Sequence, residues 1–250
     1  MKNTKQTFVF DVDGTITPSR EKISLPHHSF FKKFAYNNKV YILTGSDFPK
    51  TKEQLGDLTK DVMACYQCAG NETWHRDVLI ETADDFVMSP LLETWCKTKL
   101  RLSKFKQRTG HLHLDIRPGM MNFSILGRGG TKQQREDYIV YDLVNQERQL
   151  LADEFNEMFK GTYQAQIAGE TGIDICEEGR DKGQVFEKIL KHNSDSQIVF
   201  FGDDTQKGGN DYPFVEKITG FPHRVFSVTG PEDTFETLKS IERLFINESI

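Results

Sequence analysis

Two aspartates near the start of the chain, Asp11 and Asp13, carry the strongest chemical signal in the sequence. They follow an apolar run within residues 8–15, Phe-Val-Phe-Asp-Val-Asp-Gly-Thr. Residues two apart in a strand point to the same side, so the carboxylates can converge where the strand ends, and Gly14 allows a tight turn. Burying two carboxylates is costly unless a positive group meets them. The pattern favours magnesium-assisted phosphoryl transfer, in which one carboxylate attacks phosphorus and the other moves a proton. Read alone, it could also be a simple turn after a strand.

Three later segments carry residues that would complete such a site. Residues 40–45 end a second apolar run at the hydroxyl of Thr44, and residues 198–204 end a third run in two aspartates. Lys182 lies where a helix is predicted to begin. A transferring phosphoryl group repels a carboxylate nucleophile, so a lysine and a magnesium ion are needed to stabilise its oxygens. Taken singly, Lys182 could be a solvated lysine and Asp204 a surface cap.

The order of these groups along the chain resembles that of the haloacid dehalogenase (HAD) superfamily. The resemblance implies that Asp11 is the nucleophile and that Asp13 is the general acid and base. It also implies that Thr44 and Lys182 contact the transferring phosphoryl group. Magnesium prefers a few oxygen ligands and keeps several waters. The implied ligand set is Asp11, the main-chain carbonyl of Asp13, and Asp203.

Strand and helix signals alternate at both ends of the chain, as a parallel sheet flanked by helices requires. Between them, residues 82–179 contain helix-like stretches and period-two segments that are typical of an antiparallel sheet. We therefore predict an α/β fold, with a Rossmann-like parallel-sheet core formed by residues 1–81 and 180–250. Residues 82–179 are predicted to form an inserted α+β cap over this core.

Individual elements follow from the same patterns. A helix is predicted after Ser46 or Asp47, either of which can cap it, and another over residues 183–192. A single long helix is predicted over residues 133–159. The strands predicted for the cap span residues 111–116, 121–126, 163–167 and 172–176.

A second resemblance lies in the predicted cap. Residues 117–128 read Arg-Pro-Gly-Met-Met-Asn-Phe-Ser-Ile-Leu-Gly-Arg and are followed by Arg135. They resemble the cap signature of eukaryotic-type phosphomannomutases, Arg-Asn-Gly-Met-Leu-Asn-Val-Ser-Pro-Ile-Gly-Arg. Residues 15–20, 45–48, 53–56 and 202–211 extend the likeness over nearly the whole chain.

This resemblance implies interconversion of mannose 6-phosphate and mannose 1-phosphate through an aspartyl-phosphate. It also implies magnesium, a hexose 1,6-bisphosphate that primes Asp11, and a homodimer that pairs through the caps. Arginines suit the distal phosphate because their forks bind its oxygens bidentately and stay charged. The expected substrate-binding residues are Arg20, Arg117, Asn122, Arg128, Arg135 and Asp174.

Several positions depart from the family pattern. Thr44 stands where the family commonly has glycine, Asp204 where it has lysine, and Gly172 where it has a serine that helps to hold phosphate. The changes at Asp204 and Gly172 weaken phosphate retention, so a sugar-phosphate phosphatase of the same superfamily is the alternative. A catalytically silent sugar-phosphate binder would be expected to show a broken motif. Mannose and glucose differ in one hydroxyl orientation, which the sequence does not distinguish.

Composition is consistent with an enzyme that acts on small molecules. The 250 residues can bury a substantial core, and a net charge of −5 argues against nucleic-acid binding. The sequence has neither a membrane-length apolar run nor a signal-peptide core, so a cytoplasmic location is expected. Cys65 and Cys68 have a C-x-x-C spacing, but neither Cys96 nor Cys176 completes a zinc pattern. We expect reduced thiols.

Overall fold

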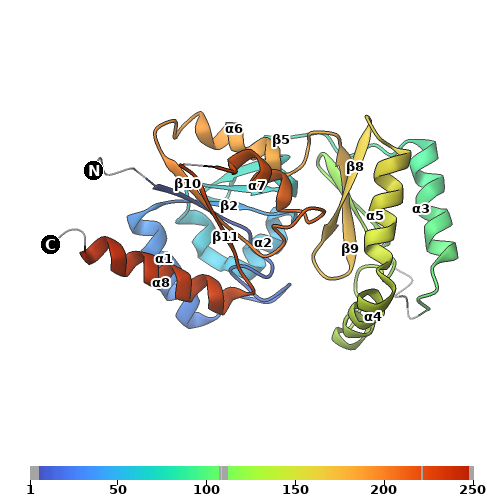
Figure 1. Ribbon diagram of the computed structural model, residues 1–250, viewed down its shortest axis with the longest axis horizontal. Coiled ribbons are helices and arrows are strands. Elements are labelled where there is room, and N and C mark those ends of the chain that lie inside the picture. The colour runs from blue at the N-terminus through green and yellow to red at the C-terminus, as the bar shows by residue number, and fades with distance from the viewer. Residues whose placement is uncertain (1–5, 107, 109–111, 221, 248–250) are drawn as a thin grey trace.

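Two β-sheets organise the computed structural model, which describes residues 6–106, 108, 112–220 and 222–247. In Figure 1 the larger sheet and its helices lie on the left, and the smaller sheet and its helices lie on the right. The chain enters the smaller part after Thr82 and leaves it after Glu177. In the described part of the chain, no helix has both the length and the apolar character needed to cross a membrane.

The larger sheet has seven strands in the order β11-β10-β1-β2-β3-β4-β5. The first five of these are parallel, and β4 and β5 extend the sheet as an antiparallel hairpin. The strands are β1 (Gln6–Phe10), β2 (Lys39–Leu43), β3 (Ala64–Gln67), β4 (Glu72–His75), β5 (Val78–Thr82), β10 (Gln197–Gly202) and β11 (Arg224–Ser227). The predicted parallel-sheet core of an α/β fold is confirmed.

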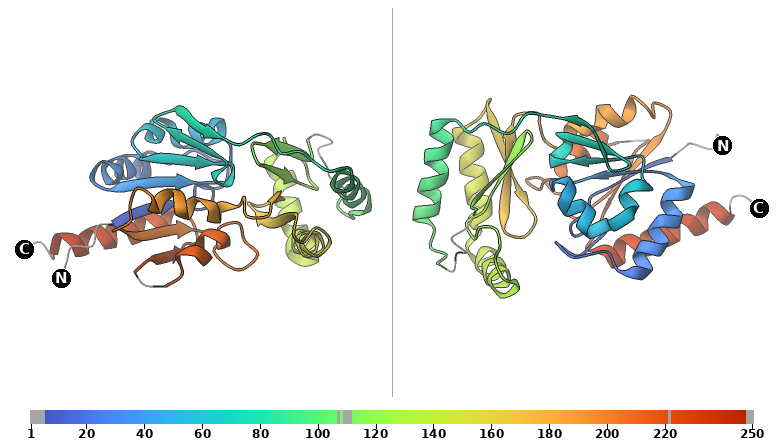
Figure 2. Two further views of the ribbon diagram at one scale, coloured as in Figure 1. Left: turned by 90° about the horizontal axis from the view of Figure 1, so that it is seen from above. Right: turned by 180° about the vertical axis from the view of Figure 1, so that it is seen from behind.

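Helices cover both faces of this sheet, which explains why its central strands are continuously apolar. Phe8 and Phe10 pack in one cluster with Phe31 and Phe235, whereas Val9 packs in another with α6 and α7. The helices are α1 (Leu25–Asn37), α2 (Phe48–Leu55), α6 (Val185–Leu190), α7 (Tyr212–Ile218) and α8 (Pro231–Asn247). Short 3₁₀ turns are η1 (Gly56–Lys60), η2 (Cys68–Gly70) and η3 (Lys182–Gln184). Figure 2 shows from above that helices lie on both sides of the sheet.

The smaller sheet is antiparallel and lies wholly within residues 82–179, in the order β6-β7-β9-β8. Its strands are β6 (Leu114–Arg117), β7 (Met120–Phe123), β8 (Tyr163–Ala168) and β9 (Gly172–Glu177). Trp95 of α3 (Pro90–Leu102) packs in one cluster with Phe123 and Phe155. These strands match the four predicted for the cap, although residue 111 lies outside the described residues. The division of the chain into core and cap domains stays a prediction.

The single helix predicted over residues 133–159 is wrong. The structure has α4 (Lys132–Asn145) and α5 (Glu147–Met158), separated by Gln146 in the left-handed region at φ 51°. Asp142 stabilises the break. Its carboxylate accepts hydrogen bonds from the backbone N–H of Arg148 at 2.8 Å and from Arg148 Nε at 2.7 Å. The apolar periodicity continues across the break, so the sequence pattern alone gave no sign of it.

The start of α4 allows a direct test of local stability. The Thr131 hydroxyl accepts the backbone N–H of Gln134 at 3.2 Å, and the Gln134 side chain accepts that of Thr131 at 2.9 Å. Thr131→Ala removes one half of this capping box and should lower the free energy of unfolding by about 1 kcal/mol. Urea denaturation measures the change, and Thr131→Ser should retain most of the wild-type value. Equal stability of the alanine and serine variants would contradict the assignment.

Candidate active site

A cavity separates the carboxyl ends of the parallel strands from the smaller sheet. Strands β10, β1 and β2 are neighbours, so the residues that follow them, Asp203, Asp11 and Thr44, meet at one edge. The core contributes Asp11, Asp13, Arg20, Thr44, Lys50, Asp203 and Asp204 to the lining. The smaller sheet and its loops contribute Arg117, Asn122, Arg128, Glu170 and Asp174. Lys182 and Arg135 are not among the described residues that line the cavity.

Lys182 contacts the predicted nucleophile, Asp11, although it does not itself line the cavity. Its ammonium lies 2.7 Å from Asp11 and 2.6 Å from Asp211, and all three side chains are nearly inaccessible. Burial by itself would lower the pKa of Lys182, but the two carboxylates raise it above its ordinary value. Lys182 therefore stays charged beside Asp11. Asp211 was missed as a site residue, although it ends the Gly-Gly-Asn-Asp run at residues 208–211.

Three carboxylates offer a place for a divalent cation. Oxygens of Asp11, Asp203 and Asp211 all lie within 4.8 Å of one another. Burial raises the pKa of Asp11 despite the opposing charge of Lys182, and desolvation with the charge of Asp211 raises the pKa of Asp203 to about 7. A cation would offset this repulsion, so the donor set fits a hard metal ion. Gly14 leaves the necessary room, since a Cβ there would lie 2.3 Å from Asp203.

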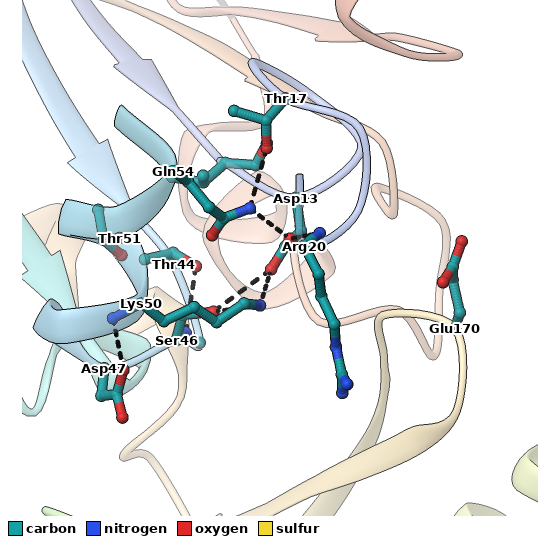
Figure 3. Close-up of polar contacts among 12 residues, drawn as sticks. Asp13, Thr17, Arg20, Thr44, Ser46, Asp47, Lys50, Thr51, Gln54 and Glu170 are labelled. Carbon is teal, nitrogen blue, oxygen red and sulfur yellow. Dashed lines mark hydrogen bonds and ion pairs between the residues drawn. The ribbon is translucent and has the colours of Figure 1, made fainter. Parts of the chain in front are cut away.

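The side chain of Asp13 turns away from this cluster toward α2. Lys50 contacts its Oδ2, while its Oδ1 accepts Gln54 Nε2 at 2.8 Å and the backbone N–H of Arg20 at 2.6 Å (Figure 3). Burial acts to raise the pKa of Asp13, but Lys50 and these donors bring it below the ordinary value. Asp13 is therefore held ionised.

The start of α2 brings Lys50 into the site. Asp47 caps α2, as one of the two predicted alternatives had it, because its carboxylate accepts the backbone N–H of Lys50 at 3.0 Å. The same first turn directs the Lys50 ammonium to Ser46 Oγ at 3.0 Å and to Asp13. Sequence reasoning missed Lys50, and its place three residues after the cap is the signal that could have found it. The buried hydroxyl of Thr44 accepts the backbone N–H of Ser46 at 3.1 Å.

The arginines of the smaller sheet are held by carboxylates. Asp115 contacts both Arg117, at 2.6 Å, and Arg128. Arg117 is buried and also donates to the main-chain carbonyl of Gly45 at 2.5 Å, which joins the two sheets across the cavity. A Cβ at Gly45 would lie 2.7 Å from Asp174 Oδ2, so a larger residue would displace the Asp174 carboxylate.

Of the other predicted binding residues, some line the cavity and one does not. Asn122 donates to Asp174 at 2.8 Å, and both line the cavity beside Arg117. Arg135 pairs instead with Glu170, at the cavity edge. Within the described part of the chain, Arg128 Nε and Arg135 Nη1 are buried without a hydrogen-bond acceptor. These unmet donors suit an anion.

The cysteines lie apart from this chemistry. All four are buried and free, and burial raises the pKa of Cys65, Cys96 and Cys176 to about 12 and that of Cys68 still further. Little thiolate exists at pH 8, and it is shielded from solvent. The native protein should therefore react slowly with Ellman's reagent, whereas the protein in guanidinium should release the signal of four thiols. Rapid reaction of one thiol in the native state would contradict this packing.

Comparison with known proteins places this geometry in a family. The sequence model described as eukaryotic phosphomannomutase matches residues 27–244. A phosphomannomutase of Galdieria sulphuraria is 32% identical over 253 residues, covering 98% of this chain and 96% of that protein. Phosphomannomutase 1 of Homo sapiens is 29% identical and covers 93% of this chain and 90% of its own length.

Solved structures agree on the fold. An IMP-nucleotidase of Plasmodium falciparum superimposes with a TM-score of 0.64 at 16% identity, covering 97% of this chain and 69% of that one. A haloacid dehalogenase-like hydrolase of Bacteroides thetaiotaomicron gives a TM-score of 0.57 at 12% identity, covering 95% and 99%. These likenesses show that the chain shares its fold with these two proteins. Given the family match over most of its length and the related sequences that span nearly all of it, the chain belongs to the eukaryotic phosphomannomutase family.

Proposed function

We propose that the protein interconverts mannose 6-phosphate and mannose 1-phosphate. The observation that carries the proposal is a single cavity lined on one side by Asp11, whose carboxylate pairs with Lys182, and on the other side by Arg128, which has a buried donor without an acceptor among the described residues. A mutase must hold a hexose bisphosphate with one phosphate at the nucleophile and the other at a distance. The two sides of the cavity provide these two places.

The transfer begins with Asp11 carrying a phosphoryl group taken from a hexose 1,6-bisphosphate. The ionised Asp13 removes the proton from the sugar hydroxyl as that oxygen attacks phosphorus, and the bond from phosphorus to Asp11 breaks. Lys182 stabilises the carboxylate that is released. The contacts of Asp13 with Lys50 and Gln54 support this order, because they favour the ionised form that the first step needs.

The bisphosphate then turns round, and Asp11 attacks the other phosphorus. Asp13 returns its proton to the sugar oxygen that leaves, so the second half-reaction reverses the proton movement of the first. Magnesium bound by Asp11, Asp203 and the main-chain carbonyl of Asp13 would offset charge on the phosphoryl oxygens. Arg20, Arg117, Arg128 and Arg135 would hold the distal phosphate, with Asn122 and Asp174 orienting it or the sugar.

The proposal includes a homodimer that pairs through the caps. Exposed apolar side chains on the cap helices support it: Leu91, Leu102, Val140, Leu143, Val144 and Leu150. Burial of such side chains against a second copy would remove apolar surface from water. The cytoplasmic location stays an expectation from the sequence.

A coupled assay tests the proposed function. Mannose 1-phosphate should be converted to mannose 6-phosphate only when magnesium and a trace of glucose 1,6-bisphosphate are present. Glucose 1-phosphate in the same assay measures whether the site distinguishes the two sugars. Absence of 6-phosphate formation from either sugar under these conditions would overturn the proposal, and steady release of inorganic phosphate would favour the phosphatase alternative.

A further inference from the structure

The tight turn between β8 and β9, residues 169–171, carries an acidic side chain to the edge of the cavity. Glu170 of this turn lines the cavity together with Arg20 and Arg128. In Figure 3 the Arg20 side chain extends from the core toward the hairpin that bears Glu170. A carboxylate at this place is unexpected in a site that must receive anionic substrates, because like charges repel.

The hairpin that holds Glu170 is fixed at several points. The backbone N–H of Ile167 donates to the carbonyl of Gly208 at 3.1 Å, which ties the end of β8 to the core. Arg148 Nη1 donates to the carbonyl of Gly169 at 2.6 Å, next to Glu170 itself. The backbone of the turn is therefore anchored, so the carboxylate moves by rotation of the Glu170 side chain.

Glu170 is bound to one of the arginines on which the distal phosphate depends. Its Oε2 contacts Arg135 Nη2, and the two side chains are unequally enclosed, with 13% of Arg135 exposed and 42% of Glu170. Arg135 also has a buried Nη1 without an acceptor among the described residues. The Arg135 side chain is largely enclosed by the protein, whereas the Glu170 carboxylate retains room to rotate into solvent.

The Glu170–Arg135 pair is close enough to Arg20 for both of its charges to affect the pKa of Arg20. Desolvation and the positive charge of Arg135 lower the pKa of Arg20, and Glu170 opposes that effect. Asp115 also binds arginines, but it lies on β6 and contacts both Arg117 and Arg128, with 23% of its side chain exposed. Asp115 is thus built into the sheet, whereas Glu170 stands on a turn and pairs with one arginine among the residues that the structure describes.

We propose that Glu170 is an exchangeable anion that occupies Arg135 in the free protein and weakens the affinity of the cavity for phosphate groups. The proposal rests on the proposed function, since it assigns to Glu170 the setting of substrate affinity. An incoming phosphate takes the place of the carboxylate on Arg135, and Glu170 turns outward. The exchange limits how tightly the distal phosphate is held and so favours release of the intermediate or product.

Binding of inorganic phosphate without magnesium tests the exchange apart from turnover. Glu170→Gln removes the competing charge, and calorimetric titration should give a dissociation constant about three- to tenfold lower than that of the wild type. The matched control is Glu154→Gln. Glu154 is also on the predicted cap, pairs with Lys99 and is 45% exposed, but lies away from the cavity. Both variants change the net charge equally, so the control should keep the wild-type dissociation constant.

Two outcomes would overturn the proposal. If Glu170→Gln binds phosphate no more tightly than Glu154→Gln, the carboxylate does not compete. If it binds more weakly than the wild type, Glu170 positions Arg135 for the ligand. In the mutase assay, Glu170→Gln should also lower the KM for mannose 1-phosphate. A wild-type protein that lacks mutase activity would refute the proposed function alone, because the phosphate titration reads the Glu170 effect without turnover.

Discussion

Replacing Asp11 by asparagine is expected to reduce turnover by at least about 10³-fold, because an amide cannot accept and release the phosphoryl group. The replacement is nearly isosteric, and its side-chain oxygen can still accept from Lys182, which lies 2.7 Å from Asp11 Oδ1. The fold should therefore survive. Steady-state rates with mannose 1-phosphate, together with urea denaturation of the same variant, separate the two effects.

A matched control for this variant is Asp57→Asn. Asp57 is also ion-paired, with Lys32 at 2.9 Å, but it lies on η1 with 58% of its side chain exposed. Its turnover should stay within about twofold of the wild type, as expected for a surface pair. Retained turnover in Asp11→Asn would remove Asp11 from the role of nucleophile.

Lys182→Met is expected to damage both activity and stability. The Lys182 side chain is 1% exposed, and its ammonium contacts both Asp11 and Asp211, so its loss leaves two buried carboxylates without that partner. Removal of one member of a buried ion pair costs about 3–5 kcal/mol of folding free energy. Turnover should also fall by about 10²-fold or more, because the charge on the transferring phosphoryl group is no longer offset.

Lys188→Met serves as the comparison. Lys188 is also close to the helix start after η3, but its partner Glu81 is 61% exposed and 3.0 Å away. This variant should lose no more than about 1 kcal/mol and should keep its activity. Added magnesium should recover part of the stability of Lys182→Met if the three clustered carboxylates bind it. Equal stability of the two lysine variants would contradict the structural role of Lys182.

The sequence predicted the position of a residue or strand correctly where one physical rule determines that position. Parallel strands end at one edge of a sheet, so the carboxyl ends of apolar runs pointed to Asp11, Thr44 and Asp203. The structure brings these three residues to the edge of the cavity. Period-two alternation similarly located the strands of the smaller sheet. Their catalytic and metal-binding roles stay predictions, because proximity alone does not test chemistry.

These rules do not predict which charged residues pair when they lie far apart in the sequence. Lys50, Asp115, Glu170 and Asp211 each pair with a residue on another segment that the fold brings close, and sequence periodicity does not predict such pairs. Arg135 shows the same limit, since its place in the motif suggested the cavity but the structure gives it a glutamate as partner. The break at Gln146 was also invisible, because a left-handed residue leaves the apolar pattern intact.

Phosphorus NMR follows the phosphoryl group directly during the proposed mutase reaction. The protein is mixed with mannose 1-phosphate, magnesium and a trace of glucose 1,6-bisphosphate, and the signals of both sugar phosphates and of inorganic phosphate are recorded together. We expect the 1-phosphate signal to be replaced by the 6-phosphate signal with little free phosphate, because the cavity would retain the bisphosphate while it turns. Accumulation of inorganic phosphate in place of the 6-phosphate would contradict the proposed mutase activity and identify a phosphatase.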